Sequence, residues 1–221
     1  MKGHLVKKIR FIGDVHGKYN RYKKLIKDVP VSMQVGDMGV GFRGFSDINS
    51  ITYLTNPPFD SMEKGDHHYI RGNHDNPGAC KQQKHWIPDG TVHNGVFCSG
   101  GAASIDRAWR TEGLDWWEDE ELSYSDAMKV FDSYTDSKPR YVMTHDCPPS
   151  ISDMLVKSKM QLGGVTTNLM GNMFEAHKPE LWIFGHWHTS FDKVVLGTRF
   201  ICLNELEHID LEIEGKENEV H

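Results

Sequence analysis

The chain has 221 residues, of which 38% are hydrophobic, and a formal net charge of −6. This length suits one domain with a sizeable core, and no apolar stretch approaches the roughly 20 residues of a membrane span. A negative chain without a lysine- or arginine-rich run is a poor match for long nucleic acid, which binds by phosphate neutralisation. A nucleotide substrate is not excluded.

Residues 1–213 are expected to form a single domain, and the polar residues 214–221 a C-terminal tail. Because the first four residues lead directly into an apolar run, we expect no signal peptide. The cysteines have no paired spacing, which predicts reduced thiols. We therefore expect a cytoplasmic protein that does not bind membranes, and the sequence favours no oligomeric state.

The first half of the chain alternates apolar runs with one amphipathic segment. Runs at residues 9–13, 31–36 and 68–72 predict buried strands. Between the first two, Tyr19 to Val29 has apolar residues at helical spacing, and Pro30 ends the predicted helix. Residues 39–60 predict an irregular insert with one helix around Asp47–Leu54.

The second half begins with a predicted hairpin at Thr91–Ala103, whose turn is Asn94-Gly95. A capping box at residues 123–126 predicts a helix that runs to Tyr134. Two further buried strands are expected at 140–144 and 181–185, with a helix at 167–176 between them. The closing segments 194–196, 200–203 and 208–213 predict antiparallel strands.

Each of the five buried runs ends in side chains that bind metal ions well: Asp14 with His16, Asp37, Asn73, His145, and His186 with His188. The carboxyl ends of parallel strands are where α/β folds place ligands, so we expect these seven donors to meet at one edge of one sheet. Donors at positions i and i+2 of an extended chain face the same way. Mixed carboxylates and imidazoles suit first-row divalent ions better than magnesium or calcium.

Five ordered blocks resemble those of the calcineurin-like metallophosphoesterase superfamily, over residues 13–188. They are Gly13-Asp14-Val15-His16-Gly17, Gly36-Asp37, Gly72-Asn73-His74-Asp75, Thr144-His145 and Gly185-His186-Trp187-His188. The resemblance implies an α/β fold in which a two-sheet β-sandwich is flanked by helices, with four layers in the order αββα. The small size resembles the compact phosphoesterases of bacteria and their viruses.

The resemblance also implies a centre of two divalent ions, with Mn²⁺ as the first expectation and Fe, Zn, Ni or Co as alternatives. Asp14, His16 and His188 would bind one ion, Asn73, His145 and His186 the other, and Asp37 both. Such a pair can hold a bridging hydroxide nucleophile and clamp a phosphoryl oxygen. His74 would contact the phosphate and protonate the leaving oxygen, and Asp75 would hold the His74 ring.

The expected function is therefore hydrolysis of phosphomonoesters or phosphodiesters in small substrates, nucleotides among them. Four arginines are candidate substrate contacts or, equally, partners in surface salt bridges: Arg43, Arg71, Arg107 and Arg110. Ser/Thr protein phosphatases carry Asp-Arg-Gly in the second block, whereas Arg43-Gly44 is displaced here. A Ser/Thr-type protein phosphatase, a non-catalytic binding module that keeps the fold, and a nuclease remain the alternatives.

Aromatic and cysteine residues near these blocks have simpler expected roles. Trp116 and Trp117 could form a rim over the pocket, but packing beneath a loop is favoured. Trp187 should point away from the metals into the core, and Cys147 is expected to be a small buried hydrophobe.

Overall fold

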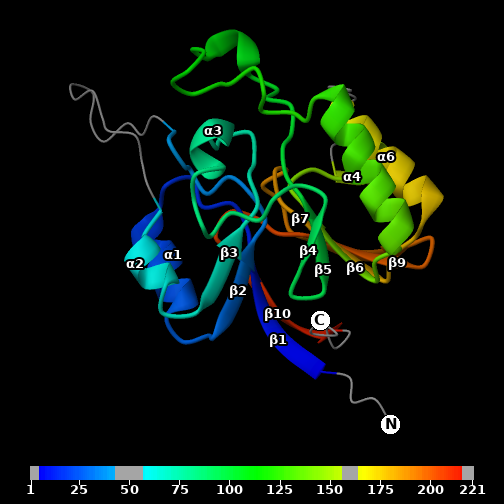
Figure 1. Ribbon diagram of the computed structural model, residues 1–221, viewed down its shortest axis with the longest axis horizontal. Coiled ribbons are helices and arrows are strands. Elements are labelled where there is room, and N and C mark those ends of the chain that lie inside the picture. The colour runs from blue at the N-terminus through cyan, green and yellow to red at the C-terminus, as the bar shows by residue number, and fades with distance from the viewer. Residues whose placement is uncertain (1–4, 43–56, 156–163, 216–221) are drawn as a thin grey trace.

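The computed structural model describes residues 5–42, 57–155 and 164–215 (Figure 1). The strands of this part are β1 Leu5–Ile12, β2 Val31–Gln34, β3 Asp66–Tyr69, β4 Thr91–His93, β5 Val96–Ser99, β6 Tyr141–Thr144, β7 Leu181–Phe184, β8 Phe191–Val195, β9 Thr198–Cys202 and β10 His208–Gly215. The helices are α1 Tyr19–Ile26, α2 Phe59–Met62, α3 Pro77–Cys80, α4 Tyr124–Ser137, α5 Pro149–Leu155 and α6 Val165–Ala176. A 3-10 turn spans Arg107–Trp109. The helix expected around Asp47–Leu54 lies outside the described residues.

The strands form two mixed sheets, in the orders β10-β1-β2-β3 and β4-β5-β6-β7-β9-β8. Strands β1, β2 and β3 are parallel, as are β5, β6, β7 and β9, while β10, β4 and β8 pair antiparallel at the edges. The five predicted buried strands are all present, but they divide between the sheets. The expectation of one sheet edge was therefore wrong, because apolar runs identify buried strands without showing which sheet they join.

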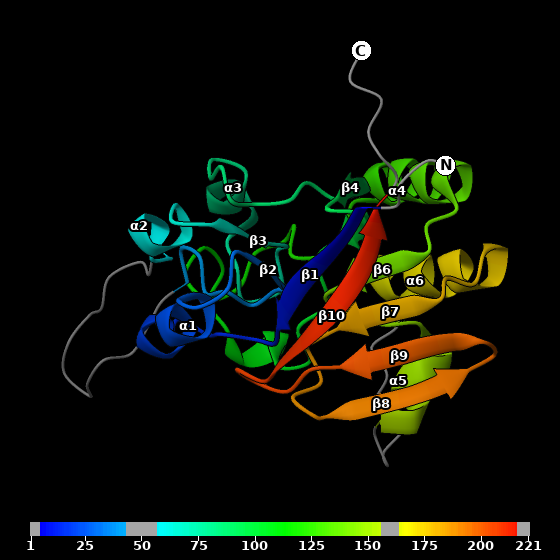
Figure 2. The same cartoon turned by 90° about the horizontal axis from the view of Figure 1, so that it is seen from below.

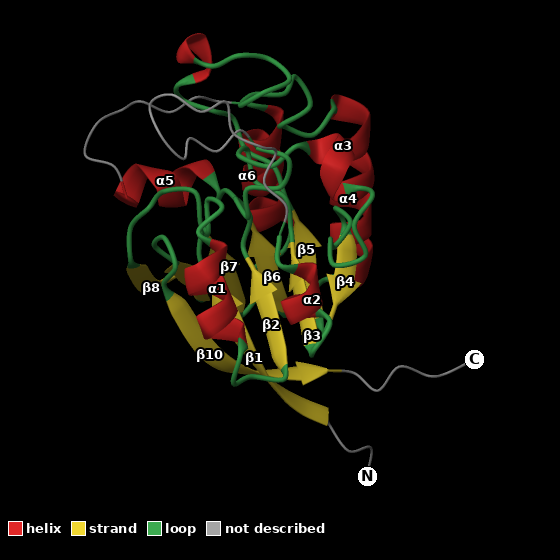
Figure 3. Cartoon of the chain, turned by 90° about the vertical axis from the view of Figure 1, so that its left-hand side faces the viewer, coloured by secondary structure: helices red, strands yellow, loops and turns green. Residues whose placement is uncertain are grey.

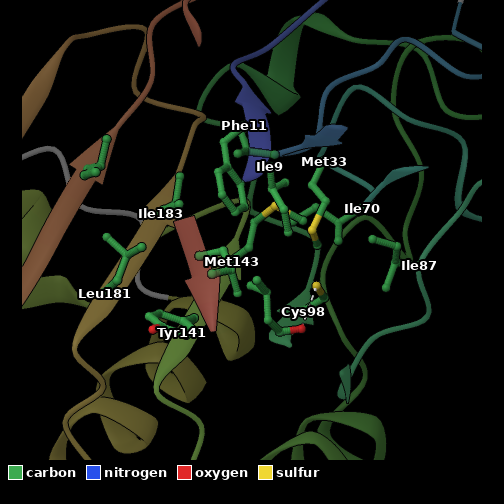
Figure 4. Close-up of a cluster of buried hydrophobic side chains, with 14 of the residues drawn as sticks. Ile9, Phe11, Met33, Ile70, Ile87, Cys98, Tyr141, Met143, Leu181 and Ile183 are labelled. Atoms are coloured by element: carbon green, nitrogen blue, oxygen red, sulfur yellow. Dashed lines mark hydrogen bonds between the residues drawn. The ribbon is translucent and has the colours of Figure 1, made fainter. Parts of the chain in front are cut away.

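The interior of the sandwich is built from alternate residues of both sheets. Figure 4 shows this cluster, in which Ile9 and Met33 from one sheet meet Met143 and Ile183 from the other. The intervening residues of β7, Trp182 and Phe184, belong to a second cluster on the opposite face. Both faces of these strands are therefore buried, which explains why they read as continuous apolar runs.

Helices cover the two outer faces of the sandwich. Tyr22 and Ile26 of α1 pack with Ile12 and Tyr69 of the first sheet, and α4 and α6 cover the second sheet. Figures 1 and 3 show these helices on opposite sides of the strands. The layers thus follow the order helices, sheet, sheet, helices, which confirms the predicted α/β sandwich.

Local sequence signals placed several element boundaries correctly. Ser123 accepts a hydrogen bond from the backbone N–H of Asp126 at the start of α4, as the capping box predicts. The predicted turn between β4 and β5 has Asn94 and Gly95 in left-handed conformations, with φ of 49° and 81°. Helix α1 ends at Ile26, three residues before the predicted end, and α4 continues three residues beyond Tyr134.

The closing strands differ from the expectation in position and pairing. Residues 194–196 were predicted as a strand, but β8 begins at Phe191 and Leu196-Gly197 form its left-handed turn to β9, with φ of 50° and 89°. Strand β9 pairs parallel with β7 as well as antiparallel with β8. Strand β10 crosses to the first sheet beside β1 (Figure 2) and continues to Gly215, two residues into the predicted tail.

All four cysteines are buried and free. None of the helices in the described ranges has the length and apolar character needed to span a membrane.

Candidate metal centre

The seven predicted donor residues come together where loops leave the carboxyl ends of strands from both sheets. Asp14 and His16 follow β1, Asp37 follows β2 and Asn73 follows β3. His145 follows β6, and His186 and His188 follow β7. The centre therefore lies across the ends of two sheets rather than on the edge of one.

Asp14, His16 and His188 form one group of donors with Asp37. Nε2 of His16 lies 2.9 Å from Nε2 of His188, which in turn lies 3.1 Å from Oδ2 of Asp14. One donor atom from each of the four residues falls within 4.8 Å of the others. Asp14 is buried whereas His188 is exposed, so this side of the centre faces solvent.

Asn73, His145 and His186 form the second group. Oδ1 of Asn73 lies 3.1 Å from Nε2 of His145 and 3.0 Å from Nδ1 of His186. His145 is fully buried and His186 is partly buried. The resemblance implied these three residues as one ligand set, and the structure brings their side chains together.

Asp37 lies between the two groups, and one of its carboxylate oxygens faces each group. Its Oδ1 lies 3.3 Å from Nε2 of His145, and its Oδ2 lies 3.8 Å from Nε2 of His16. The two oxygens of this carboxylate thus face different donor groups, at the position for which the resemblance implied a bridging role. Carboxylate, imidazole and amide side chains are donors that first-row divalent ions accept.

The backbone around the donors is strained and crowded. His16, Asp37, His186 and His188 all adopt left-handed conformations, with φ from 45° to 66°, a region sparsely populated by residues other than glycine. Such strain persists only where the surrounding structure fixes it, and it concentrates at functional sites. Gly72 allows the close packing here, because a Cβ at this position would collide with Asp37 and would come within 2.7 Å of Nε2 of His145.

Outer contacts orient two of the donors. Nδ1 of His145 donates to the carbonyl oxygen of Val35 over 2.8 Å, which leaves Nε2 as the ligand atom. The amide nitrogen of Asn73 donates to Oγ of Ser104 over 3.1 Å, so its oxygen faces the histidines. Ser104 is in turn held by Glu120. Sequence reasoning missed Ser104 and Glu120, since they lie in a loop without a readable motif.

Asp37 and the neighbouring histidines shift one another's pKa values. Burial would raise the pKa of Asp37, but His145, His74 and His16 hold that pKa well below its usual range. Burial opposes protonation of His145, yet Asp37 raises the pKa of His145 to about 10. The hydrogen bond to Asp14 likewise raises the pKa of His188. Because metal ions bind deprotonated donors, protons and divalent cations would compete for these side chains.

His74 lies beside this centre, with its backbone N–H donating to Oδ1 of Asp37 over 2.7 Å. Its ring stacks on Phe42 with an interplanar angle of 3°, and its centroid lies 4.8 Å from that of His16. Nη2 of Arg110 lies 2.6 Å from Nε2 of His74. The guanidinium is held by both oxygens of Asp106, at 2.6 and 2.8 Å.

Asp75 does not hold the His74 ring as predicted. Its carboxylate is fully buried and accepts hydrogen bonds from the backbone N–H groups of four residues, Met38, Gly39, Val40 and Gly72. The carboxylate therefore fixes the loop that follows Asp37. The expectation failed because adjacent side chains on this turn point in different directions, and Arg110 occupies the place beside the ring.

The four candidate arginines have different surroundings. Arg110 alone of the three described arginines contacts His74. Arg71 is buried, with its guanidinium bound to Asp89 and to backbone carbonyls at residues 119 and 120, so its contacts are internal. Arg107 is exposed and lies 4.1 Å above the ring of Trp116. Arg43 lies outside the described residues.

The neighbouring tryptophans pack into the protein. Trp116 and Trp117 are both 8% exposed, and the ring centroid of Trp117 lies 5.7 Å from that of Phe42. Their burial agrees with the packing role favoured from the sequence. Trp187 packs against the outer cluster of the second sheet and donates from its indole nitrogen to Asp146 over 2.9 Å. Cys147 is buried in the same cluster. Asp146, which sequence reasoning missed, also accepts a hydrogen bond from Thr167.

Comparison with known proteins agrees with this architecture. The family model described as calcineurin-like phosphoesterase matches residues 7–190. A search among curated proteins found no significant match.

Solved structures of low sequence identity resemble the chain. The TT1561 protein of Thermus thermophilus superposes with a TM-score of 0.55 at 12% identity, over 92% of this chain and 91% of that one. A phosphatase from Mycoplasma pneumoniae gives a TM-score of 0.45 at 10% identity, over 92% of this chain and 73% of its own. At these identities, the first likeness supports the fold alone.

Proposed function

The chain belongs to the calcineurin-like phosphoesterase family, and from this we propose that it is a hydrolase of phosphate esters that works through two divalent metal ions. Its substrates are small phosphomonoesters or phosphodiesters, including nucleotides. Mn²⁺ is the proposed ion, with Fe, Zn, Ni or Co as alternatives.

The single observation that carries the two-ion proposal is the position of Asp37 between two donor groups. Asp14, His16 and His188 would hold one ion, and Asn73, His145 and His186 the other, with one oxygen of Asp37 for each. Two divalent ions there would supply positive charge that polarises a phosphoryl group and acidifies water. The residues of the chain supply the remaining interactions.

His74 and Arg110 form the substrate side of the proposed site. Burial lowers the pKa of His74 to about 4. The negative charge of Asp37 opposes this shift, and the positive charge of Arg110 adds to it. A phosphate ester bound here would bring negative charge and draw the guanidinium toward its own oxygens. Both changes raise the pKa of His74, so its ring can carry a proton to the leaving oxygen when substrate is bound.

The test is turnover by the purified protein after removal of metals and their stepwise return. We expect a chelator to abolish hydrolysis of para-nitrophenyl phosphate and its bis diester, and Mn²⁺ to restore it. Two ions per chain should be needed for full activity. Full activity in the presence of excess chelator would refute the proposal.

The same assay separates the alternatives with three further substrates. A nucleotide panel tests the small-substrate proposal, a phosphopeptide tests a protein phosphatase, and a plasmid tests a nuclease. Metal binding without turnover of any of them would favour a binding module that keeps the fold.

A further inference from the structure

A second group of metal-binding side chains lies at the other end of the strands. Asp66 and His68 begin β3, while His93 ends β4 at the turn into β5. The candidate metal centre follows the last residues of β1, β2 and β3, so this group is at the opposite end of the first sheet. None of its three residues belongs to the five blocks discussed above.

The three side chains converge on one carboxylate oxygen. Nε2 of His68 lies 3.0 Å from Oδ1 of Asp66, and Nε2 of His93 lies 3.7 Å from the same oxygen. One donor atom from each residue falls within 4.8 Å of the others. Ligands about 2.0–2.2 Å from a tetrahedral zinc ion are separated by roughly 3.3–3.6 Å, so the spacing suits a single ion.

Hydrogen bonds to the second oxygen of Asp66 orient its carboxylate toward the two histidines. Oδ2 of Asp66 accepts hydrogen bonds from Asn94 at 3.0 Å and Lys7 at 3.3 Å, which leaves Oδ1 facing the imidazoles. The rings of His68 and His93 lie 4.2 Å apart between centroids. Fixed second contacts of this kind orient the ligands of metal sites. Lys7 remains on the far oxygen and does not block the space between the histidines.

The surroundings of His93 are a second observation that points to a ligand. Its Nε2 is buried, yet among the described residues it has no partner at hydrogen-bonding distance, since Oδ1 of Asp66 is 3.7 Å away. A buried polar atom without a hydrogen bond is costly. Burial also lowers the pKa of His93, an effect that Asp66 only partly offsets. A neutral imidazole nitrogen that lacks a partner is suited to bind a metal ion.

We propose that Asp66, His68 and His93 bind one divalent ion of the zinc class, separately from the centre around Asp37. The two imidazoles and one carboxylate select an ion that accepts nitrogen ligands, and partial exposure of all three residues leaves room for water as a fourth ligand. Strand β3 is an edge of one sheet and β4 an edge of the other. Figure 1 shows β3 and β4 close to each other. Bound zinc would therefore link the two sheets and stabilise the sandwich.

The test compares zinc binding by the wild-type protein and by His68→Ala and His93→Ala variants. After chelation, zinc return and desalting, we expect one zinc ion fewer per chain in each variant. His208→Ala, which removes an exposed histidine of β10, should retain the wild-type number. Equal zinc content in the wild-type protein and both cluster variants would overturn the proposal.

A thermal measurement completes the test. Zinc should raise the Tm of the wild-type and His208→Ala proteins more than that of the His93→Ala protein. If an alanine variant does not fold, Asp66→Asn provides a second variant with similar side-chain volume, and it too should lose one ion. Because the readout is a difference between variants, it does not depend on the number of ions around Asp37 or on catalysis. An Asp66→Asn protein with the full zinc content and the full thermal shift would contradict the site.

Discussion

Nη2 of Arg110 lies 2.6 Å from Nε2 of His74, so the guanidinium caps the imidazole beside the candidate metal centre. Asp106 holds this guanidinium through two hydrogen bonds. Two residues that are 36 positions apart in the chain thus lie in contact, and the loop that bears Arg110 becomes part of the proposed substrate site.

Replacement of Arg110 by alanine should weaken catalysis through the loss of a charge-assisted hydrogen bond to phosphate. At about 1.5–3 kcal/mol for such a bond, kcat/KM should fall by about 10- to 100-fold. Arg107→Ala is the matched control, because Arg107 is exposed and stacks on Trp116, whereas the contact with His74 is made by Arg110. Steady-state kinetics on the same substrate measure both variants. Equal kcat/KM values for the two would exclude the assigned role.

His74→Ala should retain its metal ions and lose most turnover. His74 donates to Asp37 through its backbone N–H, so truncation of the side chain leaves that hydrogen bond and the ligand set intact. Loss of a general acid typically lowers the rate by about 10²- to 10⁴-fold. Metal analysis and kcat must be measured on the same preparation. A variant with full turnover would remove His74 from the mechanism, and one without metal would make it a structural residue.

Gly72→Ala should disrupt the metal centre. The added Cβ would collide with the carboxylate of Asp37 and approach His145, so the bridging position is displaced. Gly78→Ala in α3 is the control, since its Cβ would approach nothing closer than 3.4 Å. Metal content should fall in the first variant only. Two bound ions in Gly72→Ala would show that the site tolerates the displacement.

Asp75→Asn should destabilise the protein rather than act mainly on the chemical step. The amide would turn a donor toward backbone N–H groups that now donate to the carboxylate, at a cost of about 1–3 kcal/mol. For a domain of this size, Tm should fall by about 2–12 °C. The exposed Asp60→Asn is a suitable control. An unchanged Tm with a reduced kcat would instead restore the catalytic role predicted from the sequence.

The sequence predicted the elements and ligands whose signals are local. Buried strands with a donor at the end, the Asn94-Gly95 turn and the Ser123 cap all depend on neighbours in the chain. The four-layer fold with two sheets followed from the resemblance of the ordered blocks. The sequence did not predict which strand joins which sheet, because strand pairing depends on contacts between distant segments.

The same reasoning explains which site residues were misjudged. The sequence around Arg110 does not differ from that around Arg71 in any way that indicates their roles. In the structure, Arg110 contacts His74, whereas Arg71 binds the backbone of a loop. Asp75 follows His74 in sequence but turns to the backbone after Asp37. The cluster around Asp66 joins strands of different sheets, so the spacing of its histidines carried no signal.

The central claim is that Asp37 bridges two cations. A crystal of the protein grown with Mn²⁺, with anomalous data collected at the manganese edge, tests it most directly. We predict two anomalous peaks about 3.5–4 Å apart, with one oxygen of Asp37 bound to each. A single peak, or two peaks with both Asp37 oxygens on the same ion, would contradict the account.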